Sequence, residues 1–138
     1  MKSILSICIA LFAWPLLSQT AETPVIVTKI KSGESLSLNG YSIQLVEVTE
    51  DSRCPSDVTC VWAGQAKVKV LISHHGNTEE KEIVFKGNNI GNEKEHTLLT
   101  TDKKAIVARQ LHPYPISTDY GKREYVLEVF ETFIKSNK

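Results

Sequence analysis

The sequence lacks the features that mark several large classes of protein. Its 16 Lys and Arg balance 16 Asp and Glu over 138 residues. It therefore has none of the charge excess by which non-specific nucleic-acid binders and polybasic membrane-surface proteins attract their partners. An apolar fraction of 41% with 23% charged residues excludes intrinsic disorder as the main state of the chain. What is left is a globular protein of one domain's length.

Signatures of enzymatic chemistry are missing as well. The sequence contains no G-x-S-x-G, no H-E-x-x-H and no paired-carboxylate motif. Glu79, Glu80 and Glu82 lie beside a predicted hairpin turn, where charged side chains protect a strand edge from pairing. A Ser-His-Asp triad assembles in space rather than at a fixed spacing, so a hydrolase stays as a less favoured alternative. The favoured prediction is a protein that is not an enzyme and has no catalytic residue.

Metal-ligand spacing is not found either. The candidate ligands are the four histidines, His74, His75, His96 and His112. Neighbouring side chains on a strand point to opposite faces of the sheet, so we interpret His74 and His75 as polar turn residues. Cys54 and Cys60 have a spacing that fits no usual zinc signature. We expect no metal and no cofactor, and metal binding is a less favoured function.

The longest apolar run is too short for a membrane span. It extends over 14 residues from Ile4 to Leu17, whereas a helix needs ~20 residues to cross a bilayer. Lys2 precedes the run and small or polar residues follow it, which is the pattern of a secretory signal peptide. We predict a signal peptide over residues 1–21 and a single β-domain over residues 22–138, exported to the periplasm or secreted.

Removal of this segment changes the arithmetic of charge and cysteine. The segment contains Lys2 and no acidic residue, so 15 basic and 16 acidic residues are left, with a net charge of −1. It also contains Cys8, which leaves Cys54 and Cys60 as the two cysteines of the mature chain. We expect no transmembrane segment after this removal.

The mature sequence is dominated by period-two alternation in short runs, which predicts antiparallel β-structure. Asn39-Gly40 is a strong two-residue turn signal. It places Leu38 opposite Tyr41 and Leu36 opposite Ile43, so the apolar residues share one face. The pattern slips after Leu45, which predicts a β-bulge.

A second hairpin is predicted around Gly76-Asn77. With that turn, Val70 lies opposite Ile83 and Val68 lies opposite Phe85. A longer loop over residues 74–77 keeps the same apolar face.

The other elements follow from β-branched and aromatic runs. Strands are predicted over 25–30, 97–100, 105–111 and 125–134, with a polar, mobile connection over 87–96. The strand over 105–111 has a helix as its alternative, because Asp102 is a helix-capping residue; Pro113 and Pro115 favour a strand at a sheet edge. About seven strands of this kind indicate a small antiparallel barrel resembling the OB type, with an immunoglobulin-like sandwich as the alternative.

The segment from Asp51 to Gly64 is the most distinctive part of the sequence. In an oxidising compartment Cys54 and Cys60 are expected to form a disulfide, which contributes about 2–2.5 kcal/mol in the chain-entropy model. Counting by twos from Cys60 places Trp62 on the core face as internal support, with Gly64 leaving room beside the indole.

These residues resemble a group of small exported bacterial β-domains with the pattern S-R-C-P-x4-C-x-W-x-G. The pattern corresponds here to Ser52–Pro55 and Cys60–Gly64, and the run from Leu111 to Pro115 is similar to the group too. The group has no settled activity, so the resemblance implies an exported β-domain and supplies no catalytic residue. A weaker similarity, in size and strand pattern alone, is to exported bacterial peptidase inhibitors built on OB-like barrels.

Function is predicted from the braced loop. A preorganised loop loses little conformational entropy on binding, so we expect a non-enzymatic module that binds another macromolecule. Its most specific version is a peptidase inhibitor. The predicted partner-contacting residues are Arg53, Pro55, Ser56, Asp57 and Val58. The partner is expected to be a protein, either a peptidase or an envelope protein, and not a nucleic acid.

The alternative is a structural envelope protein in which the disulfide is only a staple. In that case the segment from Pro113 to Ile116 could mark a sheet edge that adds a partner strand.

Overall fold

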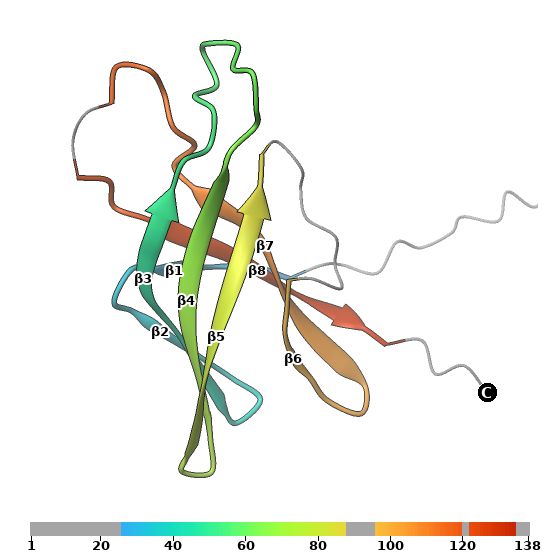
Figure 1. Cartoon of the computed structure of the whole chain (residues 1–138). Helices are drawn as coiled ribbons and strands as arrows, with labels where there is room; N and C mark the ends of the chain where they lie inside the picture. Colours follow the sequence, from blue (N-terminus) through green and yellow to red (C-terminus); the bar gives the residue numbers. More distant parts are fainter. Residues whose placement is uncertain (1–25, 88–95, 120–121, 135–138) are drawn as a thin grey trace, which may run out of the picture.

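The protein is built entirely from antiparallel strands. The computed structural model describes residues 26–87, 96–119 and 122–134, so the predicted signal peptide and most of the predicted 87–96 connection lie outside the described residues. The described residues form eight strands (Figure 1): β1 (Val27–Lys31), β2 (Ser35–Leu38), β3 (Tyr41–Asp51), β4 (Gln65–His74), β5 (Asn77–Lys86), β6 (Thr97–Thr100), β7 (Lys104–His112) and β8 (Val126–Phe133). The predicted all-β antiparallel class is confirmed.

The strands form two four-stranded sheets. One has the order β1-β8-β7-β6 and the other has the order β2-β3-β4-β5. Side chains join the sheets where β5 meets β6, because Lys81 Nζ donates to the carbonyl oxygen of Thr97 and His96 Nε2 lies 3.0 Å from the carbonyl oxygen of Val84. No ladder joins β5 to β6 in the described residues, so the strands form two facing sheets, an arrangement consistent with a small β-sandwich or a barrel-like domain.

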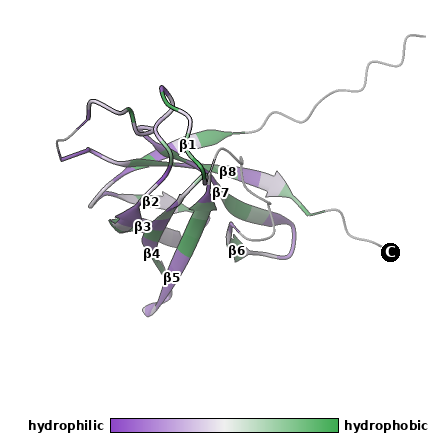
Figure 2. Ribbon diagram, turned by 45° about the horizontal axis from the view of Figure 1, so that its top comes forward, coloured by the Kyte–Doolittle hydropathy of each residue, from purple (hydrophilic) through white to green (hydrophobic). Residues whose placement is uncertain are grey.

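The core lies between the two sheets. Alternate apolar side chains along each strand point inward, as period-two patterning requires, and Figure 2 shows apolar residues in green along β4, β5 and β7. The largest fully buried side chains are Ile30, Ile43, Leu45, Ile83, Leu111, Leu127, Val68, Val70 and Val129.

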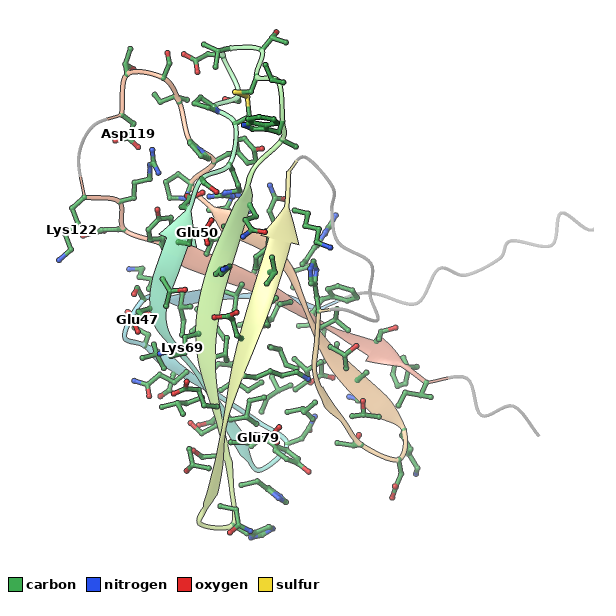
Figure 3. The ribbon with its side chains drawn as sticks, in the orientation of Figure 1. Glu47, Glu50, Lys69, Glu79, Asp119 and Lys122 are labelled. Carbon is green, nitrogen blue, oxygen red and sulfur yellow. A yellow bond between two sulfur atoms is a disulfide. The ribbon has the colours of Figure 1, made fainter. Side chains whose placement is uncertain are left out.

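Charged side chains cover the outer face of the β2–β5 sheet. Glu47, Glu50 and Lys69 lie over β3 and β4 (Figure 3). Lys69 Nζ is 3.3 Å from Glu47 Oε1, and Lys67 Nζ is 3.1 Å from Glu50 Oε2. Opposite charges on paired strands stabilise their register.

The first predicted hairpin is confirmed in register. Leu38 pairs with Tyr41 and Leu36 pairs with Ile43, and Asn39 and Gly40 both take positive φ, at 51° and 81°. The predicted bulge after Leu45 is present as a register shift between Leu45 and Glu47.

The second hairpin has the predicted face but not the first predicted register. Val68 pairs with Ile83, and Val70 pairs with Lys81. The two turn residues are His75 and Gly76, with φ of 49° and 82°, so the turn lies one residue earlier than predicted and each pairing shifts by two. A shift of two conserves the face, and the longer loop considered above gives the observed register.

The 105–111 segment is a strand, as predicted. β7 lies between β6 and β8, but β6 pairs only with residues 105–107, whereas β8 pairs with β7 as far as His112. Pro113 and Pro115 therefore follow the end of β7 that, among the described residues, is paired in the sheet on one side only. β5 does lie at the edge of its sheet, where Glu79, Glu80 and Glu82 are exposed, as predicted.

Candidate functional site

Two long loops, one from each sheet, meet at one end of the molecule (Figure 1). The first connects β3 to β4, and the second connects β7 to β8. We call the surface formed by residues 54–63 and 113–119 the apex. The turn of the β4–β5 hairpin lies at the opposite end (Figure 1).

Backbone hydrogen bonds continue the β3–β4 hairpin into the apex. Ser52 N donates to Gln65 O at 2.7 Å, and Cys54 N donates to Ala63 O at 2.9 Å. The disulfide between Cys54 and Cys60 closes the loop above these bonds, with Cα atoms 5.9 Å apart. The disulfide expected from the sequence is therefore present.

Arg53 lies under the apex and not on it. Its residue is only 5% exposed, and its guanidinium forms a bidentate pair with Asp51, at 2.7 Å from Oδ1 and 2.8 Å from Oδ2. The same guanidinium donates to the carbonyl oxygens of Leu111, at 2.8 Å, and Pro113, at 3.0 Å. Arg53 thus fastens the end of β3 to the end of β7 in the other sheet, and its burial leaves little of the side chain for the predicted contact with a partner.

The Asp51 carboxylate also binds the part of the second loop that leads into β8. Tyr125 Oη donates to Asp51 Oδ2 at 3.0 Å, and Arg123 Nη1 is 3.4 Å from the same atom. Burial raises the pKa of Asp51, but the hydrogen bonds and charge of Arg53 outweigh it and hold that pKa below its usual value. Burial raises the pKa of Tyr125. These groups bind the chain to itself, so we interpret them as a structural clamp.

Asp57 joins the two loops to each other. Ser117 N donates to Asp57 Oδ1 at 2.8 Å, and Ser117 Oγ donates to Oδ2. These bonds hold the pKa of Asp57 below its usual value. Ser56 N also donates to Pro115 O, at 2.9 Å. Of the predicted contact residues, Asp57 therefore holds the apex together, while Ser56 and Val58 are exposed and Pro55 is half-buried.

The predicted position of Trp62 in the core is wrong. Trp62 is 80% exposed. Counting by twos from Cys60 fails because β4 begins only at Gln65 and Gly64 turns the chain with a φ of 67°.

Gly64 has a different role from the one predicted. A Cβ atom at this position would lie 1.8 Å from the backbone oxygen of Ser52, so the residue allows the two arms of the loop to approach, and it does not leave room for the indole.

The apex presents a cluster of exposed apolar side chains. Eight large apolar residues are exposed among those the structure describes, and four of them lie here: Val58 (47%), Val61 (92%), Trp62 (80%) and Ile116 (47%). Sequence reasoning placed only Val58 on this surface. The signal for Val61 and Trp62 was Gly64, since a glycine within a strand pattern often marks a bulge, a bend or a close approach of backbone.

No group of three or more His, Cys, Asp or Glu in the described part of the chain could hold a metal ion. No helix among these residues has the length and apolar character needed to cross a membrane. The disulfide is compatible with an oxidising, exported location.

Comparison with known proteins gives no relative. No family model matches the chain, and neither a curated protein nor a solved structure matches it. The class that the structure defines is an all-β domain of two facing antiparallel sheets with a disulfide-closed loop at one end.

Proposed function

We propose that the protein is a small exported module, periplasmic or secreted and without enzymatic activity, that binds another protein through its apex. The observation that carries this proposal is the exposure of Val61 and Trp62, at 92% and 80%, on loops fixed by the disulfide and by the buried Arg53–Asp51 pair. Tryptophan dominates the binding energy of many protein interfaces. An indole held in water on a rigid loop loses little freedom when a partner covers it.

The charges around the apex favour an apolar protein surface as the partner. Arg53 and Asp57 are engaged with Asp51 and Ser117, and Arg123 bonds to Asp119. The projecting side chains of Val58, Val61 and Trp62 are uncharged. An anionic lipid or a nucleic acid would require cationic side chains to meet its phosphates, so we favour a partner with an apolar pocket.

Photo-crosslinking from the apex tests this proposal. Benzoylphenylalanine replaces Val61 in one sample and Glu79, which is exposed near the opposite end of the molecule (Figure 3), in the matched control. We expect irradiation of the producing cells to give a discrete adduct from position 61 only. Added wild-type protein should suppress it, whereas Trp62→Ala protein should compete about 30-fold less well, since loss of a hot-spot residue removes about 2 kcal/mol or more.

Three results would contradict the proposal: no adduct from position 61, equal labelling from both positions, or equal competition by the Trp62→Ala protein. Each of them would favour the alternative, a structural envelope protein in which the disulfide is only a staple.

Peptidase inhibition is the more specific form of the proposal. Val58 lies between the two cysteines and is 47% exposed. The disulfide-closed loop therefore presents an apolar side chain that the active-site cleft of a peptidase could accept. If the captured partner is a peptidase, the protein should slow its hydrolysis of a peptide substrate, and Val58→Asp should relieve that inhibition. A partner that is not a peptidase would exclude this form and retain the binding module.

A further inference from the structure

The end of the molecule opposite the apex contains an open surface pocket. The turns of the β2–β3 and β4–β5 hairpins lie side by side there, because Tyr41 pairs with His74 across β3 and β4. The pocket has a volume of about 230 Å³, and the residues that line it include Ser37, Tyr41, Ser42, Ser73, His74 and His75. It is independent of the apex and of the function proposed for it.

The rings of the two adjacent histidines are in edge-to-face contact beside this pocket. Neighbouring side chains on a strand point to opposite faces, but His75 is a turn residue, as predicted, with a φ of 49°. Its ring centroid therefore lies only 4.0 Å from that of His74, with the planes at 64°. The reason for setting these histidines aside as ligands is thereby removed.

Tyr41 fixes the orientation of one of the two rings. Its ring stacks on His74 with centroids 3.9 Å apart and planes 11° from parallel. Stacking occupies a face of the imidazole, whereas the lone pair that binds a metal lies in the ring plane. The stack therefore holds His74 in place, and Tyr41 does not cover the edge of the ring that carries the nitrogen atoms.

We propose that His74 and His75 bind a divalent late transition-metal ion, with copper(II) held most tightly. Imidazole is a preferred ligand of copper, nickel and zinc, and affinity for such sites rises to copper(II). With metal–nitrogen bonds of about 2.0–2.1 Å, two imidazoles on one ion have ring centroids about 5 Å apart. His75 is exposed, so its side chain can open the present separation of 4.0 Å by this amount. Water completes the coordination.

Titration of copper(II) chloride into the purified, disulfide-intact protein tests the site. We expect one equivalent to bind in calorimetry and to give an electron paramagnetic resonance spectrum with hyperfine structure from two imidazole nitrogens. His74→Gln and His75→Asn should each weaken binding at least tenfold. Asn tolerates the positive φ at position 75, so that variant keeps the turn and removes only the ligand.

His112→Ala is the matched control, since His112 is a partly exposed histidine paired with Glu128 at the end of β7. It should bind copper(II) as the wild type does. No binding, a spectrum without two imidazole nitrogens, or an affinity unchanged in either His74→Gln or His75→Asn would overturn the assignment. So would an equal loss in His112→Ala.

Discussion

Arg53→Ala is expected to lower the free energy of unfolding by about 3–5 kcal/mol, the range observed when one member of a buried ion pair is removed. The side chains of Arg53 and Asp51 are only 2% and 4% exposed. Without the guanidinium, the Asp51 carboxylate would lie buried with its strongest partner missing, and the carbonyl oxygens of Leu111 and Pro113 would each lose a donor. Urea denaturation followed by circular dichroism measures the change.

Lys67→Ala is the matched control for this prediction. Lys67 pairs with Glu50, but both side chains are more than a third exposed, at 35% and 37%, and exposed pairs contribute about 0–1 kcal/mol. Arg53→Lys should fall between the two, since it keeps a charge and loses the fork that bonds to both carboxylate oxygens. Equal losses in Arg53→Ala and Lys67→Ala would contradict the clamp.

Gly64→Ala is expected to destabilise the protein by about 3 kcal/mol or more. The positive φ alone disfavours a Cβ by about 1–2 kcal/mol, and forced overpacking adds about 1–3 kcal/mol. The overpacking arises because the new Cβ would lie 1.8 Å from the backbone oxygen of Ser52, and backbone cannot rotate away as a flexible side chain can.

Gly33→Ala separates the two contributions. Gly33 has a φ of 85°, and a Cβ there would meet nothing within 4 Å. Its replacement should therefore lower the free energy of unfolding by the positive-φ contribution alone, about 1–2 kcal/mol. If the two variants are equally stable by urea denaturation, the close approach of the loop arms at Gly64 is not a constraint on the fold.

The strands were predictable because their pattern is local. One apolar face of a hairpin is indicated by Leu36, Leu38 and Ile43. The turn at Asn39-Gly40 has a geometry that sets the register. The register of the β4–β5 hairpin was harder to predict from the sequence, because His75 also adopts a positive φ and moves the turn by one residue. Histidine is among the residues enriched in that conformation but is a weaker signal than asparagine.

At the apex, the disulfide could be predicted from the sequence, but the identity of the exposed residues could not. Two cysteines in an exported chain pair for reasons that the sequence contains. The burial of Arg53 depends on the carbonyl oxygens of Leu111 and Pro113, residues about 60 positions away, and the sequence has no local sign of that contact. Trp62 was misplaced because alternation was extended past the beginning of β4 at Gln65.

The histidines illustrate the same limit. His74 and His75 were interpreted as polar turn residues, and His75 does lie in the turn, with a φ of 49°. The contact between their rings, which this turn produces, was not predicted. Side-chain direction at the end of an element depends on a single φ, which alternation does not encode.

Equilibrium unfolding of Trp62→Ala tests the central claim most directly, namely that this indole belongs to a surface and not to the core. With Trp62 80% exposed, the account predicts a free energy of unfolding within about 0.5 kcal/mol of the wild type, in a variant that competes poorly for the partner. A loss of about 3–5 kcal/mol, the range for truncating a buried aromatic residue, would contradict it.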